Sequence, residues 1–232
     1  MKLAIMQPYF LPYIGYWQLM RAVDVFVVYD NIQYTKKGWI NRNRMLLNGS
    51  DAMFSLPLKA DADGLDVCDR SLAPSFDRSK LLRQFEGAYR RAPYFEETFP
   101  LLQRIVRGEA DNLSEYLRGS IEAMHDHLGL STELRISSHV AIDHGLKGQD
   151  KVLALCSALG AETYVNPIGG TELYDKAVFA AHGVELQFIR SQPFEYPQFG
   201  APFVPWLSIA DVLMFNPLST VRERVGGHYE TL

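Results

Sequence analysis

The sequence predicts an α/β protein: a Rossmann-like, three-layer parallel sheet with a helical insertion. Two apolar runs, KLAIMQ at residues 2–7 and VFVVY at residues 25–29, flank a helix-compatible segment at residues 16–23. Continuous apolar runs are typical of strands buried on both faces, as in parallel sheets covered by helices. Strand, loop, helix and strand within thirty residues predict a βαβ unit. The same alternation returns after residue 130, and the segment between the two regions has a helical pattern.

The middle of the chain predicts helices rather than more sheet. Apolar residues recur at helical spacing over residues 81–89 and again over residues 113–128, where Gly129 marks the end. Asn112 followed by Glu115 has the spacing of a capping box. Residues of about 75–130 are therefore expected to form a helical insertion or lobe.

The remaining elements follow in the order expected of a parallel sheet. Strands are predicted at residues 134–137, 163–166 and 184–189, and helices at residues 150–159, 171–182 and 208–215. Repeats, low-complexity tracts and linker-like stretches are absent from the sequence. A single α/β domain over residues 1–232 is the expectation.

Composition excludes several classes of function. The 232 residues carry a net charge of −4, which argues against a generally basic nucleic-acid binder. The apolar runs are shorter than the ~18–20 residues of a membrane span, and the N-terminus lacks the pattern of a signal peptide. Cys68 and Cys156 have no metal-ligand spacing, so no metal site is predicted. A cytoplasmic protein is expected, and its oligomeric state is left open.

The first candidate site is the aromatic loop after the first strand. Five rings fall within residues 9–17, and Pro8 and Pro12 stiffen this segment. Ligands of open α/β sheets bind beyond the carboxyl ends of strands, and phenol rings suit a sugar or a base. Core packing is the preferred interpretation for Phe10, Leu11 and Ile14. The residues expected to bind substrate here are Gln7, Tyr9, Tyr13 and Gly15, with Tyr16 as a candidate catalytic residue.

The second candidate site is the loop expected at residues 30–44. No acidic residue lies between Asp30 and Asp51, while four lysines and arginines oppose the charge of the whole chain. Arginine forks match phosphate or carboxylate oxygens, although a solvated basic loop is the alternative. Asp30 is the other candidate catalytic residue, as a base or hydroxyl acceptor, with an Asx turn as the alternative. The residues expected to bind substrate are Gln33, Tyr34, Trp39, Asn41 and Arg42.

Two later segments add further candidates. Gly169 and Gly170 follow a short strand, where backbone amides can face an anion, and Tyr174 comes next; an ordinary turn is the alternative. Tyr196 and Gln198 lie in a proline-rich loop that is interpreted either as a lid over the site or as a packed loop. Ser208 and Asp211 have capping-box spacing.

Three stretches of the sequence resemble the WbqC-like proteins. They are MQPYFLPYIGYWQL, DVFVVYDNIQYTKKGWINRNR and the C-terminal pattern from YVNPIGGTELYD to EYPQFGAPFVPWLSIADVLM. The resemblance spans nearly the whole chain and implies a bacterial protein, often encoded among surface-polysaccharide or sugar-modification genes. The signature positions it implies are Gln7, Pro8, Tyr9, Pro12, Gly15, Tyr16, Asp30, Gln33, Tyr34, Arg42, Gly170, Tyr174, Tyr196, Gln198, Ser208 and Asp211.

A second resemblance concerns the fold. Residues 12–16 lie where nucleotidylyltransferases and pantothenate synthetases carry their His-x-Gly-His loop, and Ile136-Ser137-Ser138 is similar to a phosphate contact of those enzymes. This resemblance implies an adenine-nucleotide α-hydrolase-like (HUP-like) Rossmann variant, with Ser137 and Ser138 binding substrate and with ATP and Mg²⁺ as cofactors by analogy. Tyrosines replace both histidines, and a phenol with a pKa near ~10 does not do the work of an imidazole.

The leading hypothesis is an enzyme of bacterial surface-polysaccharide or sugar-modification biosynthesis. It acts on a nucleotide-linked amino sugar or an acyl donor by group transfer, as an acyl or aminoacyl transferase or a nucleotide-dependent ligase. The expected ligand is a small anionic or sugar-containing molecule, with its anionic part near Arg42 and its sugar on the tyrosines and Trp39. The alternatives are a non-catalytic sugar-nucleotide-binding subunit and an interaction protein that uses the aromatic loop as its contact surface.

Overall fold

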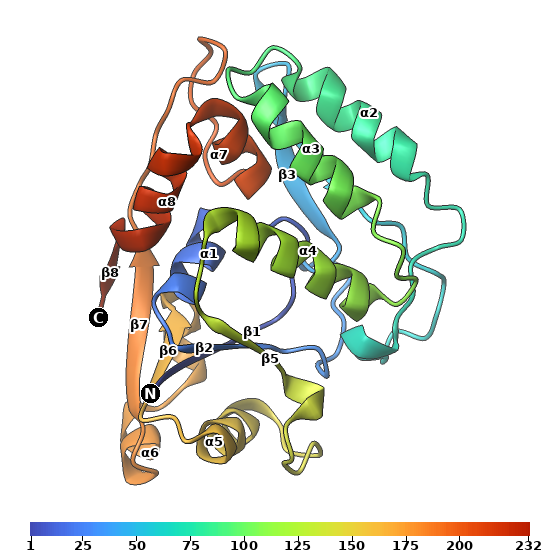
Figure 1. Cartoon of the computed structure of the whole chain (residues 1–232). Helices are drawn as coiled ribbons and strands as arrows, with labels where there is room; N and C mark the ends of the chain where they lie inside the picture. The colour runs from blue at the N-terminus through green and yellow to red at the C-terminus, as the bar shows by residue number, and fades with distance from the viewer.

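The computed structural model describes all residues, 1–232, and its centre is a six-stranded sheet in the order β5-β2-β1-β6-β7-β8 (Figure 1). Five strands run parallel, and β8 pairs antiparallel with the edge of β7. The strands are β1 (Lys2–Met6), β2 (Val25–Val28), β5 (Glu133–Ile136), β6 (Thr163–Pro167), β7 (Glu185–Ser191) and β8 (Tyr229–Thr231).

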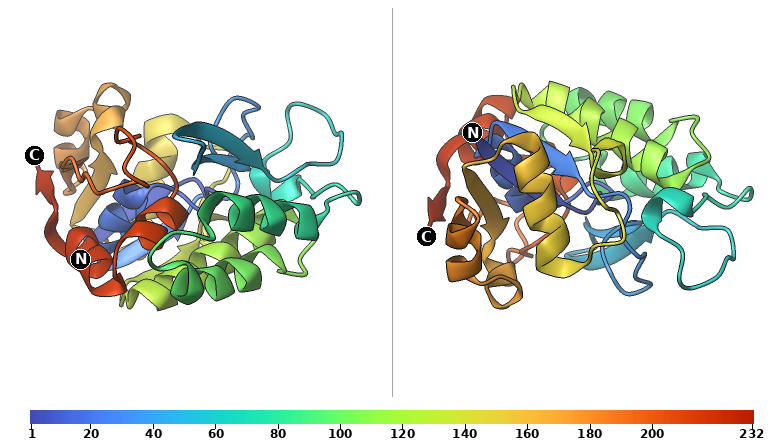
Figure 2. Two further views of the ribbon diagram at one scale, coloured as in Figure 1. Left: turned by 90° about the horizontal axis from the view of Figure 1, so that it is seen from above. Right: turned by 90° about the horizontal axis from the view of Figure 1, so that it is seen from below.

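Helices cover both faces of this sheet (Figure 2). Because strand side chains alternate, Leu3 and Ile5 of β1 face one layer while Ala4 faces the other. The first layer consists of α5 (Gly148–Leu159) and α6 (Lys176–Ala181). The opposite layer contains α1 (Ile14–Arg21), α7 (Ile209–Phe215) and α8 (Leu218–Gly227). The predicted Rossmann-like α/β fold is confirmed.

A long insertion separates β2 from β5. It contains an antiparallel hairpin of β3 (Arg42–Leu47) and β4 (Ser50–Ser55), the 3-10 turn η1 (Val67–Asp69), and the helices α2 (Arg78–Tyr89), α3 (Phe95–Val106) and α4 (Leu113–Leu128). The Asn112 side chain caps α4 by accepting from the Glu115 amide, as the spacing predicts. The expectation of a loop up to residue 44 is wrong at its end, because residues 42–44 belong to β3.

The C-terminal third differs from the prediction in detail. The helix expected at residues 171–182 is divided into the 3-10 segment η3 (Ile168–Leu173) and α6, because Asp175 caps a new helix at the Ala177 amide. The predicted strand at 134–137 ends one residue earlier, where the 3-10 turn η2 (Ser137–His139) begins. Neither α8 nor β8 is predicted from the sequence.

The strand order reverses between β1 and β6. From β1 the chain crosses to β2 on one side, and from β6 it crosses to β7 on the other. The loops that leave the carboxyl ends of β1 and β6 therefore diverge, which is where ligands bind in open α/β sheets. None of the helices combines the length and the apolar character needed to cross a bilayer.

Candidate functional site

The aromatic loop between β1 and α1 is fixed in place by hydrogen bonds from distant parts of the chain. Leu11 has a φ of 46°, a left-handed conformation that costs energy for a residue other than glycine. Its carbonyl accepts from Asn43 Nδ2 at 2.8 Å and from Ser208 Oγ at 2.7 Å. The amide of Ile209 donates to the Pro12 carbonyl at 3.0 Å. The strained loop is thus held by the hairpin and by the start of α7.

A ring-lined cavity of about 180 Å³ opens beside this loop. Its walls come from the aromatic loop, the segment before the hairpin, β3 and the proline-rich loop after β7. We name it the ring cavity, and it is lined by Tyr9, Pro12, Tyr13, Trp39, Asn43, Arg44 and Trp206. Trp39 and Trp206 remain 40% and 59% exposed, large fractions for indole rings, so a ligand can reach both rings.

Arg44 is the charged residue of the ring cavity. Its guanidinium lies over the Trp39 ring, 5.5 Å from the centroid, and pairs with Asp51 at 3.3 Å. A second nitrogen donates to the Trp206 carbonyl at 3.1 Å. Arg44 therefore joins the two exposed indoles and places a cation at the wall that they form.

Of the candidate residues, Tyr9, Tyr13 and Trp39 line the ring cavity together, whereas Arg42 and Tyr16 do not, and the cation of the cavity is Arg44. Arg42 donates through Nε to the Gly38 carbonyl at 2.9 Å, so it braces the turn that carries Trp39. Asn43, Arg44 and Trp206 are the lining residues that the sequence reasoning missed. Recognising a strand at residues 42–44 would have placed Arg44 on the same face as Arg42 and so added it to the candidates, but alternation gives no signal for Asn43 or Trp206.

The other candidate residues of the second candidate site, at residues 30–44, hold the backbone of that segment in place. The Tyr34 hydroxyl donates to Asn41 Oδ1 at 2.8 Å, and Asn41 Nδ2 donates to the Leu56 carbonyl at 2.7 Å. Gln33 forms an isolated antiparallel bridge with Asp66. These contacts fasten residues 33–41 to the rest of the insertion and so position Trp39.

Asp30 lies at the carboxyl end of β2, where it is 4% exposed. Its Oδ1 accepts from Ser137 Oγ at 2.8 Å and from the Ser138 amide at 3.0 Å, and its Oδ2 accepts from Ser138 Oγ at 2.7 Å. The two serines therefore meet the candidate catalytic carboxylate, because β5 lies beside β2 in the sheet. Their hydroxyls are directed to Asp30 rather than to open space.

Tyr16, the other candidate catalytic residue, is buried in the first turn of α1. Its hydroxyl donates to the Gln7 carbonyl at 3.2 Å, and its ring packs on Phe26 at 5.2 Å. Burial raises the pKa of Tyr16 well above its usual range, so the phenol is neutral. The Gln7 side chain accepts from Tyr9 at 3.5 Å. A Cβ on Gly15 would overlap the Tyr13 ring, so this glycine lets that ring fold back over α1.

The paired glycines lie in η3, after β6. A Cβ on Gly170 would overlap the Asn166 side-chain nitrogen, whereas Gly169 has open space around it. Asn166 is buried and accepts from the Tyr164 hydroxyl at 3.3 Å. The Tyr174 ring packs edge to face on Tyr164, with centroids 5.6 Å apart. Gly170 therefore permits a close backbone approach to the end of β6.

Tyr196 and Gln198 converge on a buried carboxylate. Asp211 is fully buried, and its Oδ1 accepts from the Tyr196 hydroxyl at 2.9 Å and from Gln198 Nε2 at 2.8 Å. The Tyr89 hydroxyl of α2 donates to Oδ2 at 3.0 Å. Burial raises the pKa of Asp211 to about 6, against the lowering effect of these donors. Ser208 caps α7 by accepting from the Ala210 amide. The proline-rich loop is thus tied to α7 and to the helical insertion.

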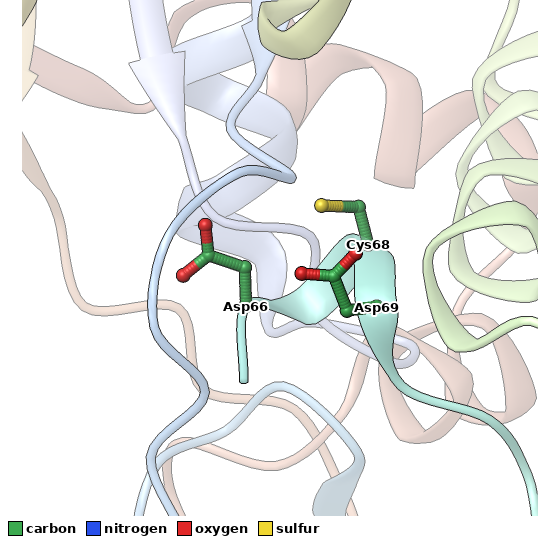
Figure 3. A group of neighbouring side chains, drawn as sticks. All are labelled: Asp66, Cys68 and Asp69. Atoms are coloured by element: carbon green, nitrogen blue, oxygen red, sulfur yellow. The ribbon is translucent and has the colours of Figure 1, made fainter. Parts of the chain in front are cut away.

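A group of potential metal ligands surrounds η1 (Figure 3). The ligand atoms of Asp66, Cys68 and Asp69 all lie within 4.8 Å of one another. Burial and the neighbouring carboxylates raise the pKa of the Cys68 thiol to about 11, so it is protonated at neutral pH. Cys68 also lines a polar cavity of about 200 Å³ with Asp30 and His139. Sequence spacing rules for cysteine pairs do not detect this group, because only one of its members is a cysteine.

The residues that resemble an ATP site do not fit a triphosphate. The Tyr16 phenol is buried, and the hydroxyls of Ser137 and Ser138 donate to the carboxylate of Asp30. A phosphate bound by these serines would face that carboxylate and be repelled by it.

Comparisons with known proteins agree with the sequence motifs. The profile of the WbqC-like protein family matches residues 7–223. A protein of Mycobacterium tuberculosis with the name "Uncharacterized protein Rv1507c" is 30% identical over 218 residues, which cover 93% of each chain. The family match begins at Gln7, the first residue after β1, and so includes every lining residue of the ring cavity. On this evidence from both comparisons, the chain belongs to the WbqC-like protein family.

Proposed function

We propose that the protein binds an anionic sugar derivative in the ring cavity and acts on it by group transfer during surface-polysaccharide or sugar-modification biosynthesis. The substrate is a nucleotide-linked amino sugar or its acyl donor. The observation that carries this proposal is the joint placement of Trp39, Trp206 and Arg44 at one cavity wall.

The chemistry of the ring cavity suits such a ligand. Indole and phenol rings offer apolar faces for the C–H groups of a pyranose and polar edges for its hydroxyls. The Arg44 guanidinium supplies donors that match phosphate oxygens. Burial raises the pKa values of both Tyr9 and Tyr13, so their hydroxyls stay neutral and act as hydrogen-bonding groups. The glycan context comes from the resemblance to the WbqC-like proteins.

A second candidate function is a sugar-nucleotide-binding subunit that performs no transfer itself. One observation favours it: the ring cavity is lined by aromatic residues, a proline, an asparagine and an arginine, with no carboxylate, thiol, imidazole or aliphatic hydroxyl. Group transfer at this cavity would then use the nucleophile of the substrate or of a partner protein.

Isothermal titration tests the binding proposal. We expect UDP-N-acetylglucosamine to bind more tightly than UDP or methyl glucoside, because it uses both the guanidinium and the rings. Arg44→Gln should weaken binding about tenfold or more, the cost of a charge-assisted hydrogen bond to phosphate. Arg83→Gln is the control, since Arg83 also pairs with an aspartate, at 3.5 Å from Asp77, but lies on α2.

Two outcomes would count against the proposal. Equal affinity of the wild type and Arg44→Gln would show that the guanidinium does not contact the ligand. Unchanged fluorescence of Trp39 and Trp206, measured in a Trp17→Phe background, would show that bound ligand does not contact the rings. Mass spectrometry of UDP-glucosamine incubated with the protein and an acyl-coenzyme A distinguishes the two candidate functions. An N-acylated product indicates group transfer, whereas unchanged UDP-glucosamine indicates binding alone.

A further inference from the structure

A second cavity adjoins the ring cavity. It has a volume of about 100 Å³, and Tyr13 and Trp206 line both cavities. The two rings meet edge to face, with centroids 5.9 Å apart and an interplanar angle of 68°. The Tyr13–Trp206 pair therefore forms the boundary between the two cavities, and each cavity lies against one side of this pair.

Aromatic rings of the proline-rich loop form the walls of the second cavity. Tyr196 lies between Phe194 and Phe203, with centroid distances of 5.2 Å and 5.1 Å. Ser191 and Gln192, at the carboxyl end of β7, add polar groups. The cavity thus belongs to the same edge of the sheet as the ring cavity.

Glu195 is the only charged residue that lines the second cavity. Its side chain is exposed and takes part in none of the ion pairs of the protein. Arg224 lies over the ring of the preceding residue, Phe194, at 5.1 Å and donates to His228 at 3.1 Å. Glu195 therefore presents an unpaired carboxylate beside aromatic faces.

We propose that Glu195 and the rings of the second cavity bind the protonated free amine of an amino sugar whose anionic part lies near Arg44. A carboxylate attracts an ammonium group by charge, and aromatic faces attract it through their quadrupoles. Arg44, which pairs with Asp51, lines one of the adjoining cavities, and the unpaired Glu195 lines the other. These two side chains match a ligand that carries both a phosphate and an ammonium group.

This inference rests on the proposed function and makes it more specific. It selects a sugar with an unmodified amine over its N-acylated form, because an amide carries no charge for Glu195 to bind. The ligand is then the acceptor of the transferred group rather than its product.

Three nucleotide sugars test the inference by isothermal titration at a pH where the sugar amine is protonated. The wild type should bind UDP-glucosamine about tenfold more tightly than UDP-N-acetylglucosamine or UDP-glucose. Glu195→Gln should abolish this preference while leaving the affinity for UDP-glucose unchanged. Glu223→Gln, a matched change at an exposed glutamate of α8, should keep the preference.

The outcomes separate the two proposals. Arg44-dependent binding of UDP-glucose without a preference for the amine would overturn the role of Glu195 and leave the proposed function intact. A preference that survives in Glu195→Gln would also overturn it. Failure of all three nucleotide sugars to bind would overturn both proposals. Loss of the preference when the pH is raised above the pKa of the sugar amine would support the charge-based recognition.

Discussion

Asn43 Nδ2 donates a 2.8 Å hydrogen bond to the carbonyl of Leu11, which has the left-handed φ of 46°. The same nitrogen donates to the Phe10 carbonyl at 3.2 Å. One buried side chain of the hairpin thus fixes the backbone of the aromatic loop, and the ring cavity depends on this contact for its shape.

Replacing Asn43 should therefore cost both stability and ligand binding. We expect Asn43→Ala to lower the free energy of unfolding by roughly 1–3 kcal/mol, because two buried carbonyls lose a donor. Urea denaturation measures the change. Ser55→Ala, at an exposed position of the same hairpin, is the control and should be close to neutral. A neutral Asn43→Ala would show that the loop keeps its conformation without this contact.

Gly15→Ala should damage the site more than the fold. The added methyl group overlaps the Tyr13 ring, which must swing away and reshape the cavity walls that it forms. Alanine also favours the helical state by up to about 1 kcal/mol over glycine, which offsets part of the structural cost. The expected result is a loss of nucleotide-sugar affinity of about tenfold or more at nearly unchanged stability.

The control for this change is Gly119→Ala in α4. Gly119 is exposed in the middle of a helix and has open space around its Cα, so the substitution should stabilise the protein by up to about 1 kcal/mol. Its effect on binding should be negligible. Equal binding by wild type and Gly15→Ala would argue that Tyr13 does not contact the ligand.

Asp211 should make stability depend on pH. Its pKa is raised from 3.8 to about 6 in the folded protein, first of all by burial. The native state thus holds this proton more tightly than the unfolded chain, and the resulting stability is fully present below about pH 4. It is lost as the pH rises through about 6.

An Asp211→Asn variant isolates this contribution, since it shares every other titrating group with the wild type. The difference in unfolding free energy, wild type minus variant, should fall by about 1.4 kcal/mol per pH unit between pH 4 and 6. Above about pH 7 it should be constant. Urea denaturation across this range measures it, and a flat difference from pH 4 to 7 would mean that Asp211 is not protonated in the native state.

Cys68 should behave as an unreactive thiol despite its position in a polar cavity. Burial and three neighbouring carboxylates raise its pKa to about 11, so little thiolate exists at neutral pH. In a Cys156→Ala background, alkylation by iodoacetamide should keep accelerating up to pH 9.5 without levelling off. Asp69→Asn should increase the rate at neutral pH. A plateau below pH 9 would contradict the assigned environment.

The parallel sheet was predictable because its strands are short apolar runs bounded by turn residues, as in VFVVY before Asp30. The β3–β4 hairpin was not, because RNRMLL mixes charges with apolar residues and has no continuous apolar run. Arg42 and Arg44 lie on the same face of β3, because side chains two positions apart on a strand point the same way. When the segment is interpreted as a loop, the sequence does not indicate which of the two arginines contacts the rings.

The partners of the candidate residues were equally hidden from the sequence. Asp30 and Ser137 are 107 positions apart and meet only because β5 pairs with β2. Trp206 enters the ring cavity from a loop whose path depends on the buried hydrogen bonds of Asp211. Local patterns cannot show contacts that arise from strand order and from a buried network.

The hydrogen bond between Ser208 and Leu11 joins positions 197 residues apart. Contacts between residues so far apart in the sequence are expected to form late in folding, because ordering the long intervening chain costs conformational entropy. During synthesis the aromatic loop leaves the ribosome well before Ser208, because Ser208 lies 197 residues further along the chain. A nascent chain therefore has no ring cavity to offer until α7 has emerged, so ligand binding reports that translation has reached the C-terminal helices.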